Sequence, residues 1–253
     1  MKKAIILLIV LLLAGGIFIY TYETSNSSDK KYLSLIPVEV FKNLTNPLTN
    51  DTLFYYNGTG YVRGIIREVP FYTEQEYYVV IKNDTGYTVF WLYYISRRGK
   101  KNVHNDLQIM FYDKYGNLRY YMYTLQLPVR EPGDITKLKG FKAEGEMERT
   151  GIRYFISWAD IIRQKRIYHG YNFNATLEKV LHYRDREILK VHEYFSDNVE
   201  RILYVDKETG IVLVDIFLGG DQTAFEYLYR ISSVDSSIAS KVSKFYSELY
   251  EQG

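Results

Sequence analysis

Residues Glu200–Ile231 read ERILYVDKETGIVLVDIFLGGDQTAFEYLYRI and contain three largely apolar runs separated by two short turns. Together with the residues before them, they predict four successive strands, Arg186–Phe195, Val199–Asp206, Ile211–Leu218 and Thr223–Ser232. The connections are three or four residues long and rich in Asp, Asn and Gly, so sequential strands should pair antiparallel. This part of the chain therefore predicts an antiparallel β-meander.

The run Ile211–Leu218 is apolar at almost every position, and Asp215 is the exception. A strand that is apolar on both faces is covered on both sides. We expect a helix on one side, and either packed core or an apolar cavity on the other. For Asp215 we expect a position at the rim of the sheet, where its carboxylate reaches solvent or an arginine.

Further strands are predicted upstream by alternation with period two and by turn residues between the runs. Two hairpins are expected, and their strands are Glu76–Lys82, Tyr87–Ile95, Asp106–Asp113 and Leu118–Gln126. Tyr61–Val69 alternates in the same way, and we expect Pro70 to end that strand. Residues 36–60 predict a short helix near Val38–Leu44 followed by loop.

The remaining segments predict helices and a long excursion. Residues 128–150 hold two prolines and three glycines, which favours an irregular region. Trp158–Ile167 predicts a short helix, and Val234–Glu251 predicts a longer one because Ile238, Val242 and Phe245 share a helical stripe. The predicted domains are 1–22, 23–59 and 60–253. The predicted fold class is mainly β (α+β), a curved antiparallel sheet or half-barrel with a few covering helices.

The segment Ala4–Tyr22 carries no charge and follows Lys2 and Lys3. As a helix it would span about 28 Å, close to the ~30 Å core of a bilayer. It predicts a single-pass transmembrane anchor, with a cytoplasmic N-terminus and an extracytoplasmic domain in the cell membrane. Two alternatives stay open: a signal peptide cleaved after Ala14-Gly15-Gly16, and an archaeal prepilin signal cleaved after Ala4.

Composition excludes several classes of function. The net charge of +2 comes from interleaved acids and bases, which argues against a nucleic-acid surface. The chain has no cysteine, so disulfides and thiol chemistry are excluded. It has 27 tyrosines, which suit half-exposed sheets; a sugar-stacking or lipid-facing surface is the alternative.

Asn-x-Ser/Thr triplets are frequent in the first part of the chain. They predict N-glycosylation of an exported protein, although Asn, Ser and Thr also gather in turns. The six candidates are Asn26, Asn43, Asn50, Asn57, Asn83 and Asn174.

The sequence shows no catalytic, cofactor-binding or metal-binding motif. The four histidines stand in no zinc-binding pattern and are expected to be ordinary strand or surface residues; they are His104, His169, His182 and His192. Glu74, Glu76 and Asp215 leave a pair of hydrolytic carboxylates open. We predict no catalytic residue, no cofactor and no metal.

One part of the meander resembles a known group of proteins. The turns Val205–Gly210 (VDKETG) and Gly219–Asp221 (GGD), with an aromatic-rich strand after them, are similar to those of the LolA/LppX/RseB group. The resemblance implies a half-barrel closed by helices around an apolar cavity, as in extracytoplasmic lipoprotein carriers and lipid sensors. The cavity residues of that group are not fixed by motif, so none is assigned here.

Three functions follow as hypotheses. The first is an extracytoplasmic binding module that holds a lipid or other apolar ligand. The second is a structural or adhesive surface glycoprotein, with other surface proteins as partners. The third, an exported hydrolase, has the least support because no catalytic motif is present. No nucleic-acid partner is expected.

Overall fold

The computed structural model describes residues 28–44, 51–64, 67–82, 86–97, 100–113, 118–125, 140–142, 167–169, 173–195, 198–234 and 240. The chain divides into two compact units, residues 1–36 and residues 37–253. In the first unit, residues 28–33 are helical. Among its described residues, the second unit contains the sheet and a short helix.

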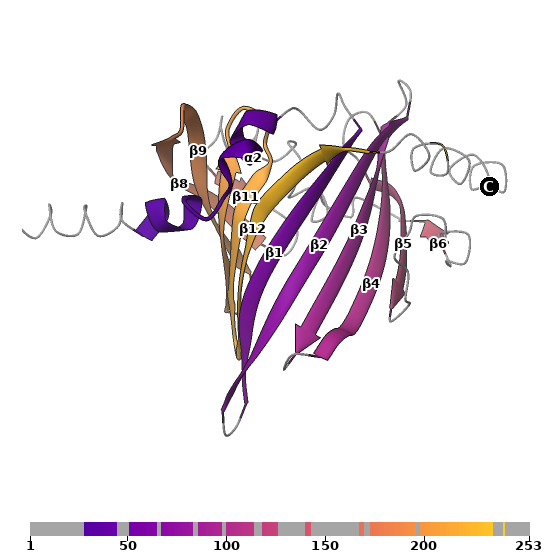
Figure 1. The fold of residues 1–253 in the computed structure, drawn as a ribbon, viewed down its shortest axis with the longest axis horizontal. Coiled ribbons are helices and arrows are strands. Elements are labelled where there is room, and N and C mark those ends of the chain that lie inside the picture. Colours follow the sequence, from indigo (N-terminus) through magenta and orange to yellow (C-terminus); the bar gives the residue numbers. More distant parts are fainter. Residues whose placement is uncertain are drawn as a thin grey trace, which may run out of the picture. The chain divides into compact units, whose positions relative to one another are not determined.

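The second unit is built on a sheet of twelve strands, all paired antiparallel (Figure 1). The strands are β1 (Thr52–Arg63), β2 (Glu68–Lys82), β3 (Gly86–Arg97), β4 (Lys100–Asp113), β5 (Leu118–Leu125), β6 (Gly140–Lys142), β7 (Ile167–His169), β8 (Phe173–Tyr183), β9 (Arg186–Phe195), β10 (Val199–Asp206), β11 (Val212–Gly219) and β12 (Gln222–Ser233).

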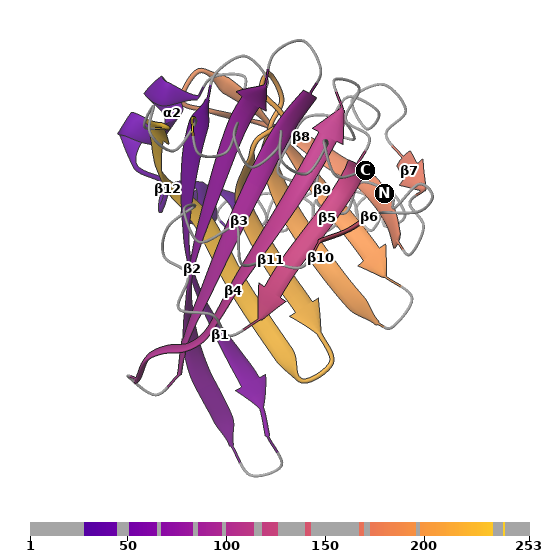
Figure 2. The ribbon, with the colours of Figure 1, turned by 90° about the vertical axis from the view of Figure 1, so that its right-hand side faces the viewer.

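The strand order is β6-β5-β4-β3-β2-β1-β12-β11-β10-β9-β8-β7. The sheet therefore consists of two meanders of six strands, and the first and last strands of the chain join them in the middle. β6 and β7 are the edges of the described sheet. The sheet is curved: in Figure 2, β3, β4 and β5 pass in front of β9, β10 and β11.

The two faces of the sheet differ in burial. We call inner the face that carries Tyr77, Val191, Leu203, Asp215 and Leu228, all of which are buried. We call outer the opposite face, which exposes several large side chains at one end; these are Tyr61, Tyr72, Tyr194 and Leu218. Around the centre of β11 both faces are buried, so the prediction of a strand covered on both sides is confirmed.

The helix α2 (Val38–Asn43) confirms the prediction of a helix near Val38–Leu44. Pro37 stands immediately before it, where its fixed φ favours the start of a helix. Its buried side chains are Val40 and Phe41, and the Phe41 ring lies 5.5 Å from that of Tyr183 in β8. The helix therefore packs against the meander β8–β12.

The predicted meander and hairpins are confirmed. The four strands predicted from Arg186 onward correspond to β9–β12, with boundaries shifted by one residue at most. The hairpins β2–β3 and β4–β5 lie where the sequence placed them, and each strand is longer than or close to its predicted length.

Two predictions in the first half were wrong. The predicted single strand Tyr61–Val69 is divided between two strands: Tyr61–Arg63 end β1, Glu68 and Val69 begin β2, and Arg63 pairs with Glu68. Pro70 lies inside β2 and pairs with Tyr61; it is tolerated because β3 first pairs with β2 at Phe71, so no ladder bond is lost on that side. The loop expected before residue 60 is strand β1 from Thr52 onward.

Several predictions concern residues that the structure does not describe. They are the transmembrane segment Ala4–Tyr22, most of the excursion at 128–150, the helix Trp158–Ile167 except its last residue, and most of the helix Val234–Glu251. Within these segments, residues 140–142 form the short strand β6 and Ile167 begins β7. Where residues are described, none forms a helix that is long and apolar enough to cross a membrane.

Candidate functional site

The inner face carries a group of charged side chains near the middle of the sheet. Asp215 of β11 lies opposite Glu226 of β12, and Arg201 of β10 lies opposite Glu193 of β9. These four residues, which we call the acidic cluster, come from four adjacent strands. The exposed fractions of the three acids are 1% for Glu193, 3% for Asp215 and 8% for Glu226. The cluster therefore places three carboxyl groups and one guanidinium inside the protein.

Asp215 is paired with Arg201. The Arg201 Nε donates to Oδ1 of Asp215 at 2.7 Å, and an Nη donates to Oδ2, so the ion pair is bidentate. The predicted arginine partner of Asp215 is confirmed, but the predicted position at the rim is wrong. β11 lies between β10 and β12, and Asp215 points to the inner face, where the guanidinium of Arg201 offsets the loss of its hydration.

Glu226 is held by side chains of β2. Thr73 Oγ1 donates to Glu226 Oε1 at 2.8 Å, and Gln75 Nε2 donates to Glu226 Oε2. The Gln75 carbonyl in turn accepts from the Tyr77 hydroxyl at 2.7 Å. β1 separates β2 from β12, so these hydrogen bonds pass over β1.

Gly58 of β1 makes this arrangement possible. A Cβ at this position would overlap Thr73 Oγ1 and the Cγ of Glu226. The glycine therefore leaves the space in which the two side chains meet, and this is the reason that a glycine occurs inside a central strand. The sequence Asn57-Gly58-Thr59-Gly60 lies in the part of residues 36–60 that was predicted as loop, and that prediction was wrong here.

Glu193 differs from the other two acids in its hydrogen bonding. Its Oε2 is buried and, among the described residues, has no hydrogen-bond partner. Burial, with the nearby charge of Asp215, raises the pKa of Glu193 to about 8. Burial and Asp215 also raise the pKa of Glu226 to about 7, against the hydrogen bonds from Thr73 and Gln75, which lower it. The cluster therefore holds protons near neutral pH.

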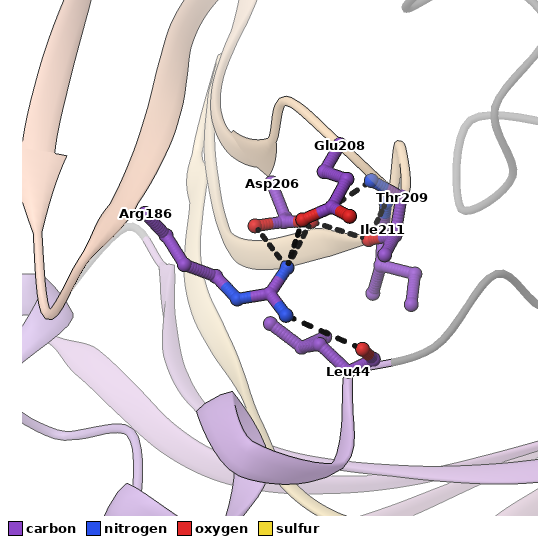
Figure 3. A network of polar contacts seen from close by, with 6 residues as sticks. All are labelled: Leu44, Arg186, Asp206, Glu208, Thr209 and Ile211. Carbon is purple, nitrogen blue, oxygen red and sulfur yellow. Dashed lines mark hydrogen bonds and ion pairs between the residues drawn. The ribbon is translucent and has the colours of Figure 1, made fainter.

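A second polar network fixes the turn between β10 and β11 (Figure 3). Asp206 Oδ2 accepts from the Thr209 backbone N at 2.9 Å and from its hydroxyl at 2.6 Å. Arg186 Nη1 donates to both Asp206 oxygens, and its Nη2 donates to the Leu44 carbonyl at 3.3 Å. Gly210 follows with a φ of 73°, a conformation that favours glycine.

These contacts explain the residues of the Val205–Gly210 turn that carry the family resemblance. The Asp caps the turn, the Thr supplies a second donor, and the Gly takes the left-handed conformation. The arginine also attaches the end of α2 to the turn. The network is fully paired and its role is structural.

The three histidines whose side chains the structure describes make separate contacts. His192 Nε2 lies 3.1 Å from Glu200 Oε2, and its ring stacks on Tyr194. His169 Nδ1 lies 2.7 Å from Asn174 Oδ1, and His182 is exposed. His104 belongs to β4. In the part of the chain that the structure describes, no group of His, Cys, Asp or Glu could hold a metal ion.

The three acids that the sequence suggested as a hydrolytic pair, Glu74, Glu76 and Asp215, do not lie together. Glu74 is exposed and Glu76 is half-buried, and both lie on the outer face, away from Asp215. Glu193 and Glu226 were missed. A signal exists for Glu193: in β9 it follows Leu189 and Val191 on one face, and Lys190 and His192 lie on the other. The alternation in β12 gives no such signal for Glu226, because Phe225 and Tyr227 occupy the opposite face.

The predicted glycosylation sites lie in different environments. Asn43 ends α2 and is exposed, and Asn174 is exposed in β8. Asn57 is half-buried within β1, so the prediction that it stands in an exposed loop was wrong. Asn26, Asn50 and Asn83 lie outside the described residues.

No protein-family model matches the sequence, and no curated protein matches it. The structure is similar to that of a beta-barrel-like protein of the domain of unknown function DUF1849 from Brucella abortus, at 10% identity and a TM-score of 0.48, covering 74% of this chain and 98% of that one. It is also similar to MucB in a complex with MucA from Pseudomonas aeruginosa, at 10% identity and a TM-score of 0.33, covering 73% and 54%.

A LolA superfamily protein from Nitrosomonas europaea is similar at 10% identity and a TM-score of 0.25, covering 74% of this chain and 87% of that one. Structures of the LolA superfamily are thus among those to which this chain is similar, as the sequence resemblance predicted.

Proposed function

We propose that this chain is an extracytoplasmic binding module that holds a lipid or another apolar ligand against the inner face of its curved sheet. The observation that carries the proposal is the composition of that face. Large apolar side chains are buried on it in strand after strand, among them Phe54, Val79, Val191, Leu203 and Leu228. A half-barrel of this kind can present a continuous apolar surface to an acyl chain.

The proposal includes attachment to a membrane. The charge-free segment Ala4–Tyr22 and the two lysines before it support an uncleaved anchor with the sheet on the extracytoplasmic side. The Asn-x-Ser/Thr triplets support glycosylation there, and the exposed Asn43 and Asn174 are the best-placed acceptors among the described residues. Intact-peptide mass spectrometry of the native protein tests this, because unmodified peptides at both positions would remove that support.

Ligand binding is tested with a fluorescent long-chain lipid titrated into the full-length protein in a non-ionic detergent. Leu203→Trp adds bulk on the inner face and should weaken binding. Ile202→Trp adds the same bulk at the neighbouring position on the outer face and is the matched control, with melting temperatures checking that both variants fold. Equal lipid affinity in the two variants, or no binding by the unmodified protein, would contradict the proposal.

A second function is supported by a different surface. Tyr61 and Tyr72 are 49% and 56% exposed on the outer face, and Tyr194 is also exposed. Exposed tyrosines are suited to contacts with other proteins or sugars. If no lipid binds, a structural or adhesive surface protein becomes the better proposal.

A further inference from the structure

We propose that the acidic cluster binds the ammonium group of an amphiphilic ligand, with the Glu193 carboxyl as its main contact. This inference rests on the proposed function and adds the chemistry of the ligand's head group. Three features carry it: the balance of charge in the cluster, the unpartnered oxygen of Glu193, and the apolar residues beside it.

The balance of charge in the cluster allows a cation to take the place of a proton. The cluster brings together three carboxyl groups and one guanidinium, and that guanidinium makes a bidentate pair with Asp215. Glu226 receives hydrogen bonds from the neutral groups of Thr73 and Gln75. Glu193 has no hydrogen bond to its Oε2 among the described residues, and Glu226 is influenced by the charge of Arg201. Because both acids hold protons near neutral pH, an ammonium would bind as Glu193 releases its proton, and the two opposite charges would then form a pair.

The geometry of Glu193 gives the ammonium its place. Buried carboxyl oxygens normally have a hydrogen-bond partner, yet Glu193 Oε2 is buried without one among the described residues. Arg201 and Asp215 share the inner face with Glu193, and Ala175 of β8 lies opposite it on the other side. The N–H groups of an ammonium would satisfy Oε2 and would favour the ionised form of the acid.

The surroundings make an amphiphile the suitable ligand. Each residue of the cluster has an apolar neighbour two positions away on the inner face. Val191 precedes Glu193, Leu203 follows Arg201, and Leu213 precedes Asp215. All three apolar side chains are buried. A head group at Glu193 would place a hydrocarbon tail against these residues. A neutral alcohol would match the tail but would not pair with the ionised form of Glu193.

The test uses the full-length protein in non-ionic detergent and three probes of equal length: dodecylammonium, dodecanol and dodecanoate. Native mass spectrometry reports the bound probe, and titration gives each dissociation constant. We expect dodecylammonium to bind at least about tenfold more tightly than dodecanol, the least effect of a buried charge-assisted contact. In Glu193→Gln, the ammonium should lose that advantage, while dodecanol binding stays unchanged.

The controls separate this inference from the proposed function. Glu74→Gln removes an exposed acid on the outer face and should leave the preference intact. Equal affinities for ammonium and alcohol, or an unchanged preference in Glu193→Gln, would overturn the inference and leave lipid binding standing. If none of the probes binds, both proposals fail.

Discussion

The stability of the protein should fall as the pH rises from about 5 to about 7, because of Glu193 and Glu226. An ordinary glutamate, as in the unfolded chain, has a pKa of 4.5, whereas in the fold the two pKa values are about 8 and about 7. At pH values between the unfolded and the folded pKa, the native state binds more protons than the unfolded state. The free energy of unfolding therefore decreases with rising pH, and this contribution is fully present only below about pH 4.5.

The size of the effect follows from the two pKa values. Each group lowers the free energy of unfolding by about 1.4 kcal/mol per pH unit between its unfolded and folded pKa. Over two pH units the pair contributes a loss of about 5 kcal/mol, a large part of the 5–15 kcal/mol that stabilises a typical domain. Glu193→Gln keeps the shape of the neutral acid and removes its titration. The decrease of the free energy of unfolding per pH unit should therefore be about half as large in this variant.

The assay is urea unfolding of the full-length protein in non-ionic detergent, followed by intrinsic fluorescence at several pH values. Glu193→Gln is compared with Glu74→Gln, whose acid is exposed. In Glu74→Gln, the free energy of unfolding should depend on pH as it does in the unmodified protein. Near neutral pH, Glu193→Gln should be the more stable of the two variants. A stability that is constant or rises from about pH 5 to pH 7, or an equal slope in both variants, would refute this account of the acidic cluster.

Three further predictions concern the central strands and the N-terminal segment. Gly58→Ala should lower the free energy of unfolding by about 1–3 kcal/mol because its Cβ would overlap side chains of two other strands; Gly64→Ala, at an exposed turn, should cost less by the same urea assay. Asp215→Asn should cost about 3–5 kcal/mol because it leaves the buried Arg201 guanidinium without its counter-charge; a loss below about 1 kcal/mol would count against a buried ion pair. If Ala4–Tyr22 is an uncleaved anchor, the native protein should remain in membranes after carbonate washing, and release with a new N-terminus would indicate a signal peptide.

The sequence predicted the second half of the sheet well because its signals are local. In β9–β12 the apolar runs, the short turns and the Gly and Asp residues all indicate the same antiparallel meander. The two-sided burial of β11 followed from its run of apolar residues, which Asp215 alone interrupts. The turn after Asp206 was recognisable because its residue types are required by the geometry of that turn.

The first half was harder to predict because its decisive contacts are distant in sequence. Gly58 looks like a loop residue until Thr73 and Glu226 are placed on either side of it. Pro70 looks like a strand terminator until the β3 ladder is known to begin one residue later. In both cases the partner strand, rather than the local sequence, decides whether the residue is tolerated.

The acidic cluster could be predicted only in part. Asp215 stood out as the single charge in an apolar strand, and an arginine partner was expected. Its depth in the sheet was not, because the pairing of β1 with β12, which continues the sheet beyond this meander, is not visible in the sequence. Glu226 lies opposite Asp215 on the adjacent strand, and Glu193 lies two strands away from Asp215. The sequence does not show that these residues are neighbours unless the register of the paired strands is known.

The most direct test of the account is to locate a bound lipid on the sheet. A long-chain lipid with a photoactivatable diazirine in its tail is incubated with the full-length protein in non-ionic detergent, irradiated, and its attachment sites are read by peptide mass spectrometry. The account predicts attachment on the inner face, at or beside Val191, Leu203 and Leu213. Attachment confined to the exposed Tyr61 and Tyr72 of the outer face, or no attachment above that of a detergent control, would contradict it.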